Sequence, residues 1–222
     1  MTIPMSPATV AVSASVQRAV APDSYLVIAT AVVHGADSAT AAAHLVTRFV
    51  ELEAVVSGLP HLGLKVERGG VSVYPEWDAK PYRGKTPTRW LARRQLSAEG
   101  RDLGQVAELV GAIGRLADVE IAGPHWQLDR DNPTHAELAA EAVHEAIARA
   151  GRYAAALGGT MGRLVELTDT GMSSGGRDIT FAASMSMDRQ SGGAVLELLD
   201  FTPQPIDLYA SVQGRWYLTL PD

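Results

Sequence analysis

Alternating apolar and polar positions predict strands near both ends of the chain. Between Val10 and Val16, apolar residues alternate with small or polar ones. From Ile206 to Leu220, apolar side chains fall on one parity and mostly polar side chains on the other. Because successive side chains of a strand point to opposite faces, the last segment predicts an antiparallel sheet with one buried and one wetter face.

Helical spacing predicts a first long helix that begins at Asp37 or Ser38, both of which are good helix caps, and ends at Gly58. Spacings of three and four residues define its buried stripe, made of Ala42, Leu45, Phe49, Leu52 and Val56. A shorter helix is predicted after Asp102 and ends near Gly114.

An alanine-rich helix is predicted to end at Gly158–Gly159, where a strand follows. Its start has two alternatives: Asn132 with Pro133 at the first helical position, or a capping box from Thr134 and Glu137. Small side chains on the buried face would let the helix approach its sheet closely. The predicted buried face is Ala139, Val143, Ala146, Ala150, Ala154 and Leu157.

Further strands are predicted between the helices. Residues 24–34 are apolar on both faces, which indicates a central strand that is covered on both sides. Residues 63–77 and 90–98 form a long-looped hairpin with a bulge at Gly69–Gly70. Pro124 bends the following strand or places it at a sheet edge.

The resulting order, β-β-α-β-β-α-β-α-β-β, predicts an α+β fold of antiparallel sheets covered by long helices. From the second strand to the fifth it reads β-α-β-β-α-β, which is the ferredoxin-like order. We predict a single domain over residues 7–220, with two subdomains of about 7–130 and 131–220 as the alternative. A long loop excursion is predicted at residues 171–204, where the periodicity is weak.

The composition of the chain excludes some kinds of catalysis and argues against some partners. The chain has 222 residues, and its 19 basic and 25 acidic side chains give a net charge of −6, which makes a nucleic-acid partner unlikely. The absence of cysteine excludes disulfides and thiolate catalysis. Neither a signal peptide nor a membrane span is visible in the sequence, so we expect a cytoplasmic protein.

Short motifs do not assemble into a catalytic constellation. The stretch "GMSSG" at Gly171–Gly175 matches G-x-S-x-G, but the strand–elbow–helix setting of that motif is missing. "RGKT" at Arg83–Thr86 lacks the first glycine of a phosphate-binding loop. The six histidines are scattered, without metal-ligand spacing. We therefore predict no catalytic residue, no cofactor and no metal site.

Two regions are candidates for contact with a partner. A basic cluster around the hairpin, interleaved with Trp77, Tyr82 and Trp90, would suit an anionic ligand, a nucleic-acid strand or an acidic protein surface, and its alternative is a solvated hairpin. The cluster consists of Lys80, Arg83, Lys85, Arg89, Arg93 and Arg94.

The long excursion at residues 171–204 is the second candidate region, because it is apolar for a loop. Its apolar side chains could pack on the same chain or on a neighbouring subunit, and the sequence does not decide between the two. Its candidate oligomer contacts are Phe181, Met185, Met187, Leu196 and Leu198.

Several stretches, taken in order, resemble the SIMPL-domain family, a bacterial group that includes periplasmic immunogenic and oxidative-stress-associated proteins. They are "SATAA" at 38–42, "VSVYPEW" at 71–77, "GPHWQL" at 123–128, the helix running into "LGGTMG" at 139–162, and the strand at 205–218. The resemblance implies an α+β fold, a tendency to form oligomers and no established catalytic residues. It also implies roles in stress tolerance or at the cell envelope, where many members are exported.

The sequence therefore predicts a non-enzymatic, oligomer-forming protein that acts as a binding or structural module, with a homo-oligomer and a protein partner as its expected contacts. Two alternatives stay open. One is a small-molecule or enzymatic cleft between sheet layers, which a cluster of buried ionisable residues would favour. The other is anion or nucleic-acid binding by the hairpin at residues 80–94, which a shared face for its basic side chains would favour.

Overall fold

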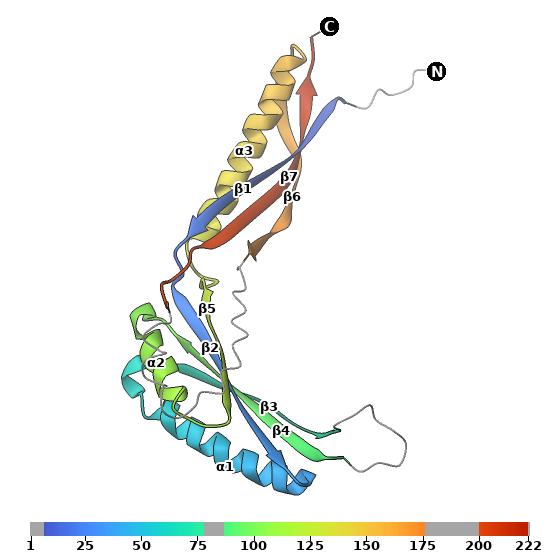
Figure 1. Cartoon of the computed structure of the whole chain (residues 1–222). Helices are drawn as coiled ribbons and strands as arrows, with labels where there is room; N and C mark the ends of the chain where they lie inside the picture. Colours follow the sequence, from blue (N-terminus) through green and yellow to red (C-terminus); the bar gives the residue numbers. More distant parts are fainter. Residues whose placement is uncertain (1–6, 78–86, 176–199, 222) are drawn as a thin grey trace. The chain divides into compact units, whose positions relative to one another are not determined.

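The chain folds into two compact units, and each is described by itself (Figure 1). The computed structural model describes residues 7–77, 87–175 and 200–221. Within these residues, the terminal unit comprises 7–21, 128–175 and 205–221. The central unit comprises 22–77, 87–127 and 200–204.

The central unit is a four-stranded antiparallel sheet of order β3-β4-β2-β5, with helices on one face. Its elements are β2 (Ser24–Gly35), α1 (Ser38–Ser57), β3 (Lys65–Glu76), β4 (Arg89–Gly100), α2 (Val106–Ile113) and β5 (Val119–Gln127), with 3-10 turns η1 (Pro60–Leu62) and η2 (Leu103–Gln105). Strands β2 and β3 flank β4, which is the split βαβ arrangement predicted by the ferredoxin-like order.

Local sequence features explain where α1 begins, where β3 bulges and why β5 lies at the sheet edge. Asp37 is the cap of α1, because its carboxylate accepts a hydrogen bond of 2.7 Å from the backbone N–H of Thr40. That bond also lowers the pKa of Asp37. The β3–β4 register shifts between Arg68 and Val71, which confirms the bulge predicted at the paired glycines. Strand β5, which contains Pro124, lies at an edge of the sheet.

The terminal unit is a three-stranded antiparallel sheet of order β1-β7-β6 with one long helix along a face (Figure 1). Its elements are β1 (Thr9–Val20), α3 (Thr134–Ala156), β6 (Thr160–Gly175) and β7 (Ile206–Thr219). The alternation predicted for the last strand is confirmed: β7 buries Ile206, Leu208, Ala210, Val212 and Trp216. The α+β class and the order of strands and helices are likewise confirmed.

The buried face of α3 differs from the predicted one. Ala146, Ala150 and Ala154 are buried as expected, but Leu138 and Ala142 are the other buried residues. Leu157 is 59% exposed and lies at the helix end, outside the contact with the sheet. The buried stripe advances in steps of four residues throughout, so Ala139 and Val143 lie at its margin. The predicted capping box is also absent, since Thr134 already lies inside the helix and Asn132 accepts a bond of 3.0 Å from its N–H.

The join between α3 and β6 requires glycine for two different reasons. Gly158 has φ +72°, a left-handed conformation that side chains other than glycine rarely adopt. Gly159 has an ordinary φ, but a Cβ atom there would collide with the carbonyl oxygen of Thr219 on β7. Small residues thus permit the sharp turn and the close return of the chain to its own sheet.

Candidate functional site

The described members of the predicted basic cluster are held by separate partners. Arg89 donates a hydrogen bond of 2.5 Å to Glu76, and Arg93 pairs with Glu120 at 3.2 Å. The guanidinium of Arg94 lies 4.1 Å from the ring centroid of Phe49 on α1, a cation–π contact.

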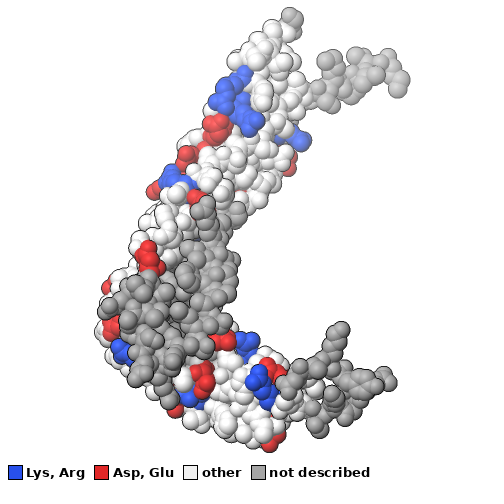
Figure 2. Space-filling view, in the orientation of Figure 1, with Lys and Arg blue, Asp and Glu red and all other residues white. Residues whose placement is uncertain are grey.

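Arg93 and Arg94 therefore point to opposite faces of the sheet, as neighbours along a strand do. Lys80, Arg83 and Lys85 lie outside the described residues. On the face shown in Figure 2, basic and acidic side chains are interspersed.

The other sequence candidates are placed as follows. Phe181, Met185, Met187, Leu196 and Leu198 lie outside the described residues. The "GMSSG" stretch forms the end of strand β6, so the first five residues of the predicted excursion belong to a strand. The backbone at this stretch continues a strand and is not the strand-to-helix elbow that nucleophilic serine chemistry uses.

His34, His44 and His61 in the described part of the chain each have a polar neighbour. His61 lies 3.0 Å from Glu108, His34 lies 3.4 Å from Glu76, and the ring of His44 bonds the carbonyl oxygen of His34. Across residues 7–77, 87–175 and 200–221, no group of three or more acidic, histidine or cysteine side chains is arranged to hold a metal ion.

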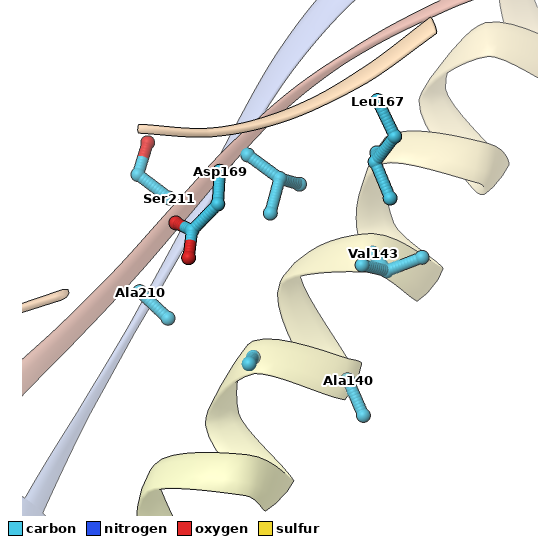
Figure 3. A pocket seen from close by; sticks show the side chains of 8 residues that line it. Ala140, Val143, Leu167, Asp169, Ala210 and Ser211 are labelled. Carbon is cyan, nitrogen blue, oxygen red and sulfur yellow. The ribbon is translucent and has the colours of Figure 1, made fainter. Parts of the chain in front are cut away.

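A groove between α3 and β6 is a concave feature of the described part of the terminal unit (Figure 3). Its volume is about 320 Å³. Ala140 and Val143 of α3 line one side, Leu167 and Asp169 of β6 line the other, and Ala210 of β7 also contributes to the lining. The groove is open, since Leu167 remains 44% exposed.

The chemistry of the groove is mainly apolar. Its single carboxylate, Asp169, accepts a hydrogen bond of 2.8 Å from the backbone N–H of Gly171. Thr170, next to the groove, donates its hydroxyl to the carbonyl oxygen of Ser211 at 2.8 Å. The groove therefore offers mainly apolar side chains and one carboxylate that already accepts a backbone hydrogen bond.

The groove exists because α3 lies off-centre on its sheet. The helix packs mainly on β1 and β7 and makes fewer contacts with β6. Every residue of β6 from Gly162 to Gly171 is exposed, and the position of α3 accounts for this on the face of the sheet that carries the helix. Among them, Leu164 is 47% and Val165 is 42% exposed, although interior positions of a strand with large apolar side chains are usually covered.

The two flanks of α3 differ in charge. On the β1 side, Arg18 pairs with Glu137 at 2.9 Å and Glu141 at 2.8 Å. These hydrogen bonds raise the pKa of Arg18, and the bond to Glu141 contributes more than the bond to Glu137. On the same side, Arg149 donates to the carbonyl oxygen of Ser13 at 3.0 Å.

The flank of α3 toward β6 carries small or apolar side chains instead. Ile147, 39% exposed, follows Val143 by one helical turn on this flank. We call the combined patch the α3–β6 surface, and it consists of Ala140, Val143, Ile147, Leu164 and Leu167.

Sequence reasoning missed this surface because it assigned Val143 to the buried stripe. A usable signal was present in the four-residue repeat of Leu138, Ala142, Ala146, Ala150 and Ala154. Choosing that repeat as the buried face would have left Val143 and Ile147 on a second, unpaired apolar stripe.

The family follows from a match along nearly the whole chain. One family, described as SIMPL, protein of unknown function (DUF541), has a sequence model that matches residues 10–216. The chain belongs to the SIMPL family. A search of the curated proteins finds no match to this SIMPL protein. In the part of it that the structure describes, no helix is long and apolar enough to cross a membrane.

Proposed function

We propose that this SIMPL protein works by self-assembly and by presenting a binding surface, without catalysing a reaction. The observation that supports the proposal is the α3–β6 surface, where a long strand and one helix flank expose large apolar side chains side by side. Soluble monomers rarely leave a contiguous apolar patch of this kind uncovered, because its hydration is unfavourable. Burial against another protein removes that cost.

The polar groups near the groove also fit binding better than catalysis. Asp169 already accepts a backbone hydrogen bond, and Arg18 is bound to two glutamates on the far flank of α3. A catalytic acid needs a proton-donating atom, and a catalytic base a proton-accepting atom, that faces the reacting group. We also propose that the protein is cytoplasmic and acts in stress tolerance.

Sedimentation velocity of the wild-type protein over the micromolar range tests this proposal. A species heavier than the 23.5 kDa protomer, whose fraction increases with concentration, is the expected result. A single species of protomer mass at every concentration would remove self-assembly from the account.

A further inference from the structure

We infer that a second copy of this chain docks on the α3–β6 surface, with the exposed flank of one α3 against the same flank of the other α3. This inference rests on the proposed function and specifies its interface. It places the two-fold axis alongside α3, so that each helix lies over β6 of its partner.

The face of β6, rather than its free backbone edge, is the docking element. Pairing of β6 with β7 is irregular at three places, between Met161 and Leu164, between Leu164 and Glu166, and between Asp169 and Met172. Such irregularities twist a strand and interrupt its row of N–H and C=O groups, which protects an edge against pairing with another strand. The side chains of Leu164 and Leu167 nevertheless remain exposed on the strand. The partner therefore has to cover side chains and not extend the sheet.

A helix is the element that fits beside α3. The flank of α3 toward β6 has small or apolar residues at successive steps of four, three, four and four residues. This spacing is that of a stripe along which two helices pack, and small residues allow their axes to approach to about 8 Å. The stripe consists of Ala136, Ala140, Val143, Ile147 and Gly151.

Charge favours a second copy as the occupant. The charged side chains Glu137, Glu141 and Arg149 are engaged with β1, on the other side of the helix. Two identical flanks toward β6 can therefore meet without like charges facing each other. A strongly acidic or basic partner would find no complementary charge in this stripe.

The size of the surface is sufficient for a weak dimer. The helix stripe is roughly 22 Å long, and the exposed part of β6 spans roughly 33 Å. With a width of about 15 Å for one helix and one strand, each protomer would bury on the order of 500 Å², or about 1,000 Å² for the pair. This area is at the lower limit of specific interfaces, so we expect a dimer that dissociates in the micromolar range.

Cysteine cross-linking tests the inference directly, because the natural chain contains no cysteine. In Ile147→Cys, and independently in Ala140→Cys, each new thiol would face its counterpart across the two-fold axis. Mild oxidation is expected to give a covalent dimer for both. The matched control is Ala148→Cys, an exposed neighbour that points elsewhere around the same helix and should stay monomeric after oxidation.

The outcomes separate this inference from the proposed function. Efficient cross-linking at 147 or 140 and little at 148 supports the interface. Equal cross-linking at all three positions, or none at 147 and 140, overturns it. If the wild-type protein still sediments as an oligomer in that case, self-assembly stands and uses another surface; if it sediments as a protomer, both statements fail.

Discussion

The ring of Tyr25 on β2 packs against Gly100 at the end of β4, where a Cβ atom would collide with the ring. The ring also makes an edge contact with Trp126, with centroids 6.5 Å apart. Its hydroxyl is buried and has no hydrogen-bond partner in the described structure. Burial, followed by the negative charges of Asp102 and Glu108, raises the pKa of Tyr25.

Replacing Tyr25 with phenylalanine should leave the protein as stable or make it more stable by up to about 1 kcal/mol, because a buried hydroxyl without a partner contributes only its desolvation cost. Urea unfolding followed by circular dichroism measures the free energy of unfolding. A loss of more than about 1 kcal/mol would mean that the hydroxyl has a partner in solution.

Tyr25 also predicts how the stability of the central unit depends on pH. Because the pKa of Tyr25 is higher in the folded chain than its ordinary value of 10.0, the contribution of this group is fully present below pH 10.0 and is lost as pH rises through the folded pKa. Stability of the central unit should therefore fall at alkaline pH, and less steeply in Tyr25→Phe. Parallel urea titrations at neutral and alkaline pH check this, and identical slopes for the two proteins would contradict it.

Gly159→Ala should destabilise the terminal unit by about 1–3 kcal/mol, because the added methyl group meets a backbone oxygen that cannot move freely. Gly151→Ala is the matched control within α3, where nothing lies within 4 Å of the new Cβ atom. The control should gain about 0.5–1 kcal/mol from the better helix propensity of alanine. Thermal unfolding of both variants measures the difference in their stability. Equal changes in stability would refute close packing at the join between α3 and β6.

Ala146→Leu tests the close seating of α3 on its sheet. Ala146 is fully buried, so the larger side chain should cost about 1–3 kcal/mol through overpacking. Ala148→Leu, at an exposed position of the same helix, should change stability by less than about 0.5 kcal/mol. Urea unfolding of the two variants measures the difference, and tolerance of leucine at 146 would show that the helix and sheet are separated by more space than the structure has.

Much of the fold could be predicted because local signals and periodicity agree. The Gly69–Gly70 bulge, the cap at Asp37 and the parity of β7 each depend on short-range chemistry, which the sequence displays directly. The rotation of α3 could not be fixed in the same way. Alanine occupies ten of the 23 positions of α3, so Ala139 and Ala142 are equally acceptable on a buried face, and contacts with the sheet decide between them.

The candidate site was harder to predict for a related reason. Arg93 and Arg94 are adjacent in sequence and looked like one basic patch, but the period of a strand sends them to opposite faces. Glu76 and Glu120, which pair with Arg89 and Arg93, come from other strands. The exposure of β6 depends on where α3 lies across the sheet, and no local pattern in residues 160–175 records that position.

Sedimentation of Ile147→Glu beside Tyr153→Glu tests the central claim of assembly through the α3–β6 surface. The glutamate at 147 would be buried against an identical charge, so its dimer should be weakened at least about tenfold. Tyr153 is 48% exposed and follows Arg149 by one turn on the flank toward β1, so a glutamate there should leave the dimer intact. Ile147 is partly exposed, and unchanged circular dichroism would show that the fold survives. An Ile147→Glu protein that assembles as tightly as the wild type would contradict the account.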